Sequence, residues 1–138
     1  MEIVRAAARA TRQAPGSSFT GTVLQDEVAV GAAPSRLRAT VVSFTPGART
    51  NWHTHAVHQV LWCLSGTGRI QKRGEPVQVL RPGDTVLIRA GEIHWHGAAP
   101  DRLFAHLSLV EAPDAGEATS WLEPVSDADY TAAPAAAG

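Results

Sequence analysis

The sequence is poor in cysteine, and it contains neither a long apolar run nor a block of charge of one sign. Cys63 is the single cysteine among 138 residues, so no disulfide can form within the chain, and we expect a reducing compartment. The apolar runs are far shorter than the about 20 residues that a membrane helix needs. The residues that follow Met1 contain no apolar core of a secretion signal, so we expect a cytoplasmic protein.

The charge balance also restricts the partners. Lysine and arginine together number 12 against 13 acidic residues, which gives a formal net charge of −1, and the basic residues form no cluster. A protein that binds nucleic acid or an anionic membrane surface usually carries such a cluster. We therefore expect a small-molecule substrate, with no nucleic acid and no membrane as partner.

Short apolar segments alternate with glycine or proline turns through most of the chain. A turn every eight to twelve residues is typical of a β-sandwich or barrel, and no stretch after residue 35 keeps a helical period. Ser126 is expected to cap one helical turn, and the Ala/Pro-rich residues 131–138 are expected to be disordered. We predict a lead-in (1–35), a barrel (36–112) and a C-terminal segment with a disordered tail (113–138). The predicted strands are 19–30, 36–44, 52–55, 59–64, 69–73, 77–80, 85–88, 93–96 and 103–110.

The first of these strands suggests an oligomer. Residues 19–28 have strand character, yet the sequence Ala32-Ala33-Pro34 separates them from the predicted barrel. An open barrel edge invites pairing with a second chain. We therefore expect a homodimer in which residues 19–28 cross to the sheet of the partner.

The histidines are the most informative residues. All six lie between positions 53 and 106, and four of them form the pairs His53/His55 and His94/His96. Alternate residues of a strand share a face, so the two members of each pair point the same way. A sheet that closes on itself would bring both pairs into one cavity. Neutral imidazole is the commonest ligand of mid-to-late first-row metals, so this spacing predicts a metal site.

These motifs resemble the cupin family. The first cupin motif, Gly-x5-His-x-His-x3-4-Glu-x6-Gly, is matched by Gly47, His53, His55, Gln59 and Gly66, with the acid replaced by its amide. The second is matched by Pro82-Gly83-Asp84, Gly91 and His94, while Arg89 replaces a proline and Ala98 an asparagine. The resemblance covers roughly residues 36–111. It implies an all-β, single-domain cupin, a double-stranded β-helix or jelly-roll barrel that holds a metal ion.

Residues 47–55 and 82–100 are similar to a narrower group, the small cupins with three histidines and one glutamine. That group includes manganese-dependent hydroxynitrile lyases of bacteria. The resemblance implies His53, His55, Gln59 and His94 as ligands of a divalent transition metal. Manganese is favoured, with iron, nickel, cobalt and zinc as alternatives. It also implies that His96 and His106 line the cavity.

The amide ligand predicts the kind of chemistry. An ion held by three imidazoles and an amide keeps its full double charge, which makes it a stronger Lewis acid that favours anions. Such an ion fits activation of a hydroxyl, carbonyl or enediolate substrate, or binding of an anion such as cyanide. The resemblance to hydroxynitrile lyases implies cleavage of a cyanohydrin to an aldehyde and cyanide, for which we expect His106 or His96 as general base and Thr50 as a hydrogen-bonding hydroxyl. Val42, Leu61 and Phe104 are expected to form the apolar wall.

Two other functions stay open. One is an oxygen-using enzyme with a redox-active metal, and the other is a binding module without turnover. His96 and His106, which lie beyond the ligand set, favour an enzyme over a binding module, whereas Gln59 does little to separate the two enzymes. The remaining expectations are His58 at the rim of the cavity, Cys63 as a small buried hydrophobe, and Trp52, Trp62 and Trp95 as packing residues.

Overall fold

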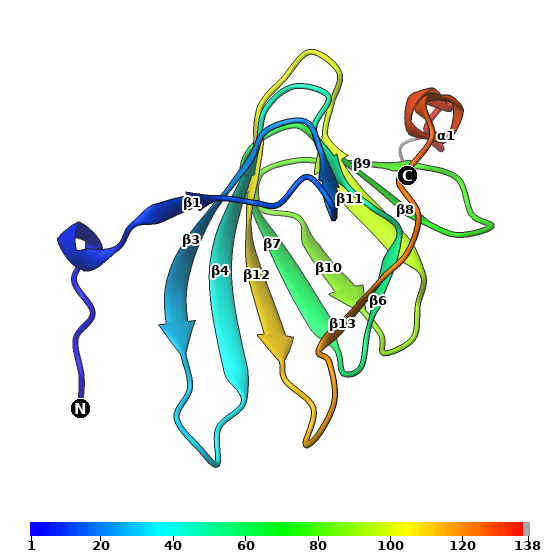
Figure 1. Ribbon diagram of the computed structural model, residues 1–138. Coiled ribbons are helices and arrows are strands. Elements are labelled where there is room, and N and C mark those ends of the chain that lie inside the picture. Colours follow the sequence, from blue (N-terminus) through cyan, green and yellow to red (C-terminus); the bar gives the residue numbers. More distant parts are fainter. Residues whose placement is uncertain (137–138) are drawn as a thin grey trace.

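The computed structural model describes residues 1–136 as two antiparallel sheets that face each other (Figure 1). One sheet has the order β1-β3-β4-β12-β7-β10, and the other has the order β13-β6-β11-β5-β2, with β8 beside β11 and β9 beside β8. The first sheet consists of β1 (Thr11–Gln13), β3 (Val23–Val30), β4 (Leu37–Phe44), β12 (Phe104–Glu111), β7 (Gln59–Gly66) and β10 (Thr85–Ile88). The second consists of β13 (Thr119–Trp121), β6 (His53–His55), β11 (His94–Ala98), β5 (Arg49–Thr50), β2 (Phe19–Thr20), β8 (Gly68–Lys72) and β9 (Gln78–Leu80).

The predicted all-β class is confirmed. Helix is confined to η1 (Ala6–Ala8) and α1 (Asp127–Thr131) among the described residues. Within residues 1–136, neither of these helices has the length and apolar character needed to span a membrane. The sequence pattern missed β1, β5 and β13, because two or three residues are too few to show an alternation.

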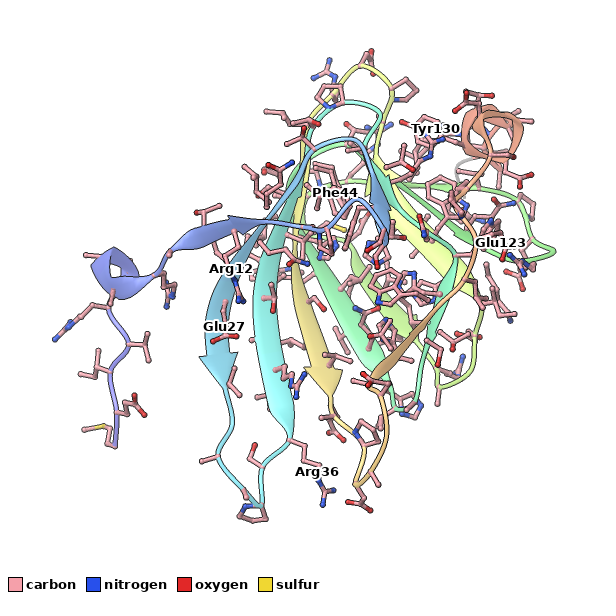
Figure 2. The ribbon with its side chains drawn as sticks, viewed as in Figure 1. Arg12, Glu27, Arg36, Phe44, Glu123 and Tyr130 are labelled. Atoms are coloured by element: carbon pink, nitrogen blue, oxygen red, sulfur yellow. The ribbon has the colours of Figure 1, made fainter. Side chains whose placement is uncertain are left out.

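Strand β12 shows how the alternation places the interior. Phe104, His106 and Ser108 are buried, whereas Ala105, Leu107 and Leu109 are only partly buried. The buried set faces the space between the sheets, where Phe44 of β4 also lies (Figure 2). The core of buried apolar side chains includes Phe44, Leu61, Cys63, Ile70 and Phe104.

The glycine that ends the first motif has a steric role. Gly66 has a φ of +76°, and a Cβ there would lie 1.7 Å from the carbonyl oxygen of Leu103. Only a residue without a side chain permits this approach of β7 to the start of β12. The motif glycine therefore allows the two strands that carry Gln59 and His106 to pair.

The early strand belongs to the barrel of its own chain. Strand β3 pairs with β4 along Val23–Val30, and Phe19 of β2 pairs with Thr50 of β5. The amide of Gly31 donates to the carbonyl oxygen of Leu37 (2.8 Å), which closes a hairpin. The predicted separation of residues 19–28 from the barrel is therefore wrong, and the sheets extend on both sides of residues 36–112. The homodimer itself stays a prediction.

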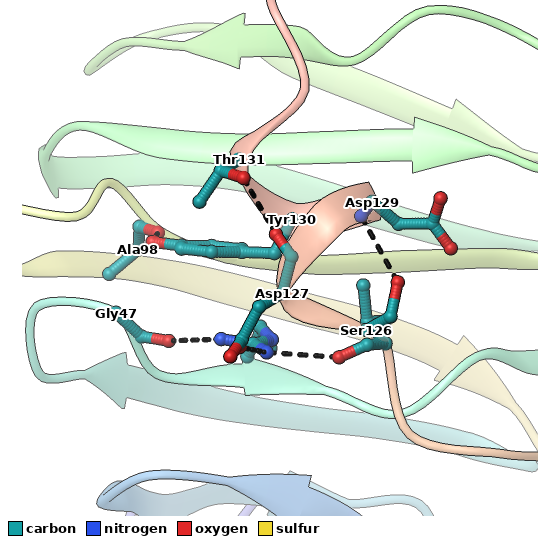
Figure 3. Close-up of polar contacts among 9 residues, drawn as sticks. Gly47, Ala98, Ser126, Asp127, Asp129, Tyr130 and Thr131 are labelled. Carbon is teal, nitrogen blue, oxygen red and sulfur yellow. Dashed lines mark hydrogen bonds and ion pairs between the residues drawn. The ribbon is translucent and has the colours of Figure 1, made fainter.

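Hydrogen bonds and an ion pair hold the C-terminal segment against the second sheet. The Oγ of Ser126 accepts from the amide of Asp129 (3.1 Å), which confirms the predicted cap, and the Tyr130 hydroxyl donates to the carbonyl oxygen of Ala98 (2.6 Å; Figure 3). The guanidinium of Arg49 donates to Asp127 (2.9 Å) and lies 4.3 Å from the centre of the Tyr130 ring.

The chain after α1 is ordered where the structure describes it. Pro134 forms a parallel bridge with Val77, and the amide of Ala135 donates to the carbonyl oxygen of Val77 (2.8 Å). The disorder expected for 131–138 is thus wrong for residues 131–136, and residues 137 and 138 lie outside the described part.

The tryptophans divide into two classes. Trp52 and Trp95 are buried in a second apolar cluster with Val77, Val125 and Tyr130, as expected of packing residues. Trp62 is 49% exposed, so its assignment as a packing residue is wrong. Trp62 lies between the buried residues Leu61 and Cys63 of β7, so its side chain points to the outer face of the six-stranded sheet.

Candidate metal centre

The two histidine pairs meet as the strand pattern predicts. His53 and His94 stand directly opposite each other in the pairing of β6 with β11, and their ring centres are 4.2 Å apart. Gln59 begins β7, and His106 lies in the middle of β12, on the opposite sheet. All the predicted site residues are buried, with exposed fractions of 0–6%.

The tightest group is not identical to the predicted ligand set. His53, His94 and His96 each offer a ring nitrogen such that the three nitrogens lie within 4.8 Å of one another. The ring centre of His55 is 5.0 Å from that of His53 and 5.4 Å from that of His94. Three buried histidines thus form a cluster able to hold a metal ion, and the assignment of His55 rather than His96 as a ligand stays a prediction.

Hydrogen bonds to one ring nitrogen orient the histidines. The Nδ1 atoms of His53 and His94 lie 2.9 and 2.8 Å from the carbonyl oxygens of Asn51 and Glu92, and the Nδ1 of His55 lies 3.1 Å from the Oγ1 of Thr119. An Nδ1–H that donates to a carbonyl leaves Nε2 as the unprotonated nitrogen. The Nε2 atoms of His55 and His94 are buried and have no hydrogen-bond partner in the described part of the chain. This is the orientation that metal-binding histidines show.

The amide of Gln59 is oriented in the same way. Its Nε2 donates to the Oγ of Ser108 (2.9 Å), while its Oε1 is buried and has no hydrogen-bond partner within residues 1–136. A buried acceptor without a partner costs about 1–3 kcal/mol. A cation bound by the unpartnered imidazole nitrogens and this oxygen would remove that cost. The residues therefore fit a divalent transition metal ion with mixed nitrogen and oxygen ligands.

His96 and His106 form a second, deeper unit. The Nε2 of His106 lies 3.1 Å from the Nδ1 of His96, which leaves the Nε2 of His96 and the Nδ1 of His106 without partners. Burial lowers the pKa of His106 to about 3. Burial, followed by the neighbouring His106, holds the pKa of His96 well below its usual value. Both rings are therefore neutral near pH 7, and one donates a hydrogen bond to the other.

Thr50 lies between the two units. Its Oγ1 accepts a hydrogen bond from the backbone amide of His96 (3.2 Å) and is 3.4 Å from the Nδ1 of His53. The predicted hydroxyl is thus present at the site.

The site opens into a cavity of about 270 Å³. Its lining includes every predicted site residue except His94, which faces a separate groove beside Lys72 and Arg89. Of the expected apolar wall, Val42 lines the cavity, whereas Leu61 and Phe104 do not and belong to the core. The full lining is Phe19, Gln25, Arg38, Thr40, Val42, Thr50, His53, His55, Gln59, His96, His106, Ser108, Val110, Thr119 and Trp121.

Two aromatic residues of this lining were not foreseen. The ring of Trp121 lies 4.8 Å from that of His53 and 5.4 Å from that of Phe19. Trp121 lies in a strand of three residues, too short to show an alternation, and Phe19, the first residue of the predicted strand 19–30, lies instead in the separate strand β2. His58, by contrast, lies in a surface groove with Leu37 and Leu109 and is absent from the cavity lining. The expected place of His58 at the rim is therefore wrong. Cys63 is buried as expected, and burial raises its pKa to about 11.

The comparison with known families decides the affiliation. Residues 40–108, which contain both histidine pairs and Gln59, match the family described as "Cupin domain". The chain belongs to the cupin family. This cupin is 42% identical over 130 residues to the (R)-mandelonitrile lyase of Granulicella tundricola, a match that covers 94% of this chain and 98% of that protein.

Solved structures agree on the fold. A cupin-like protein from Thermotoga maritima is similar with a TM-score of 0.80 and 35% identity, over 86% of this chain and 89% of that one. The DMSP lyase DddQ from Ruegeria pomeroyi is similar with a TM-score of 0.65 and 23% identity, over 88% of this chain and 64% of that one. At 23% identity this second likeness shows the fold alone.

The buried histidines predict that acid destabilises this cupin. Burial lowers the pKa of His94 to about 4 and that of His106 to about 3, whereas an unfolded histidine titrates near 6.5. The unfolded chain therefore binds more protons below pH 6.5, and stability falls as the pH falls from there. Between pH 7 and pH 5 each of these two residues should cost about 2 kcal/mol of unfolding free energy.

Urea unfolding of the chelator-treated protein at pH 5, 6 and 7 checks this expectation. Chelation separates the effect from metal release, which acid also promotes. A His106→Gln variant should show the smaller loss between pH 7 and pH 5. An unfolding free energy that is constant across this range would contradict the argument.

Proposed function

We propose that this cupin is a metal-dependent lyase that cleaves a cyanohydrin to an aldehyde and cyanide. The observation that carries the proposal is the neutral His96–His106 pair, which lines the same cavity as His55 and Gln59, whose Nε2 and Oε1 atoms have no hydrogen-bond partner among the described residues. A binding module needs no such proton-accepting pair beyond its ligands. The 42% identity to a protein named (R)-mandelonitrile lyase supports the choice of substrate.

His53, His55, Gln59 and His94 would hold the ion, with manganese favoured. A divalent ion bound there supplies Lewis acidity, which lowers the pKa of a hydroxyl group and stabilises a developing anion. The chain contributes the orientation of the ligands: Asn51, Glu92 and Ser108 hold the imidazoles and the amide as described.

The histidine pair would move the proton. A neutral imidazole of the pair accepts the hydroxyl proton of the cyanohydrin, and the 3.1 Å contact between His106 Nε2 and His96 Nδ1 shares the added charge between the two rings. The bond between the carbinol carbon and the nitrile carbon breaks, and its electron pair leaves with cyanide as the C=O bond forms. The imidazolium then returns the proton, so the products are an aldehyde and hydrogen cyanide.

The remaining lining would position the organic part of the substrate. Phe19 and Trp121 offer aromatic surface beside His53, and Val42 and Val110 add aliphatic surface. Such a mixture of apolar walls with a few polar groups is typical of small-molecule sites.

One sample can test the function against its alternatives. Elemental analysis of the purified protein should find about one transition-metal ion per chain. The same sample should release aldehyde from mandelonitrile without consuming oxygen. Oxygen uptake with phenolic or enol substrates and no aldehyde release would instead indicate the oxidative enzyme. Metal binding with neither activity would indicate a binding module.

Gln59→Glu should tighten metal binding and lower lyase activity. A carboxylate adds Coulomb attraction to the ion and reduces its remaining positive charge, which weakens its action as a Lewis acid. Ser108 can donate its hydroxyl proton to the new carboxylate, so the contact between the two residues is kept. A metal-competition assay and initial rates at equal metal occupancy measure the two effects.

Gln13→Glu is the matched control. Gln13 lies exposed on the edge strand β1, so this substitution makes the same change of charge outside the cavity. It should change neither quantity. Weaker metal binding by Gln59→Glu, or a faster rate at equal occupancy, would refute the role given to the amide.

A further inference from the structure

The cavity lining carries formal charge of one sign only. Among the described residues that line it, Arg38 alone carries a formal charge at neutral pH, and no aspartate or glutamate is present. The ligand set is neutral as well, so a bound divalent ion would add two further positive charges. A cavity of one sign with low-dielectric walls concentrates ligands of the opposite sign.

Arg38 lies at the open end of this cavity. It shares the inward face of β4 with Thr40 and Val42, and it pairs with Val110 of β12. His106 pairs with Val42, four residues further along the strand, which corresponds to about 13 Å between backbone positions. The Arg38 side chain is exposed, whereas His106 is fully buried. The histidine pair and the guanidinium thus mark the two ends of the cavity.

The guanidinium has no carboxylate partner within residues 1–136. Arg12, Arg36, Arg49 and Arg73 each form an ion pair, and Arg38 forms none. The acidic residue of the adjoining groove is Glu117, and no ion pair joins it to Arg38 within 4.0 Å. The five donors of the guanidinium therefore remain available, with the amide of Gln25 and the hydroxyl of Thr40 in the same lining.

We propose that Arg38 binds a carboxylate of the substrate, so that the substrate carries an anionic group at the end remote from the reacting carbon. The planar guanidinium matches a carboxylate with two parallel hydrogen bonds, and the aromatic pair Phe19 and Trp121 lines the same cavity. The inference rests on the proposed function for the reacting carbon, but the anion site is defined by Arg38 and the cavity alone.

The test compares the binding of two aldehydes by calorimetry: benzaldehyde and 4-carboxybenzaldehyde. The native protein should bind the carboxylate about tenfold more tightly, as expected of one charge-assisted contact, and added salt should reduce the difference. Arg38→Gln should abolish the preference, and Arg38→Lys should retain part of it. Arg102→Gln, which removes an exposed arginine outside the cavity lining, should leave the preference unchanged.

Equal affinity of the native protein for both aldehydes would overturn the proposal. So would a preference that survives in Arg38→Gln, since the carboxylate would then bind elsewhere, for example at the metal. Cleavage rates of mandelonitrile and its 4-carboxy derivative separate this proposal from the lyase function. A preference in binding without cleavage of either compound rejects the lyase and leaves the Arg38 site. Cleavage of both at equal kcat/KM, with equal aldehyde affinities, rejects the Arg38 site and leaves the lyase.

Discussion

His106→Ala is expected to keep the metal and to lower the rate of cyanohydrin cleavage about a hundredfold or more, the loss typical of a missing general base. His106 comes from β12, whereas the histidines of the predicted ligand set come from β6 and β11 of the other sheet. Within the described residues, its ring has one hydrogen-bond partner, His96 (3.1 Å), and it makes no hydrogen bond to the predicted ligands. The bonds that Asn51, Glu92 and Ser108 make to the ligands do not involve it.

A second variant guards against a purely structural effect, because alanine leaves a cavity at a fully buried position. His106→Gln fills most of the space and can still hydrogen-bond His96, but it cannot carry a proton near pH 7. Both variants should lose activity, and both must first be shown by elemental analysis to contain metal. Full occupancy with an unchanged rate would remove His106 from the mechanism and leave His96 as the histidine to test.

The double variant His53→Ala, His55→Ala is expected to purify with little metal and no detectable cleavage. It removes two of the three predicted imidazole ligands, and His53 also belongs to the tightest histidine cluster. The remaining donors, Gln59 and His94, lie on different strands and would offer two ligands where structural and catalytic sites use three or four. Elemental analysis and circular dichroism of variant and native protein, purified side by side, measure metal and fold.

His58→Ala is the matched control, since His58 belongs to the same stretch of sequence but lies outside the cavity lining. It should keep the native metal content. Single variants His55→Ala and His96→Ala then decide which of the two completes the ligand set: loss of the ligand should deplete the metal, and loss of the other should not. Equal metal content in the double variant and the native protein would overturn the site.

Local pattern was sufficient for most strands and for the histidine pairs. The two-residue repeat of a strand is a local property, so it placed His53 with His55 and His94 with His96 on one face, and it placed His106 with Phe104 and Ser108. The spacing of glycines and histidines then indicated the cupin family, which the match over residues 40–108 shows.

The tertiary structure decided what surrounds the metal. Phe19 and Trp121 line the cavity from strands of two and three residues, which are too short to show an alternation. Arg38 lines it from one end of β4, and the sequence does not indicate which end of a strand lies at the opening of a cavity. The contact between His96 and His106 joins opposite sheets. Alternation fixes the face on which a side chain lies, but strand order and register, which arise from pairing between distant segments, determine which side chains meet across the barrel.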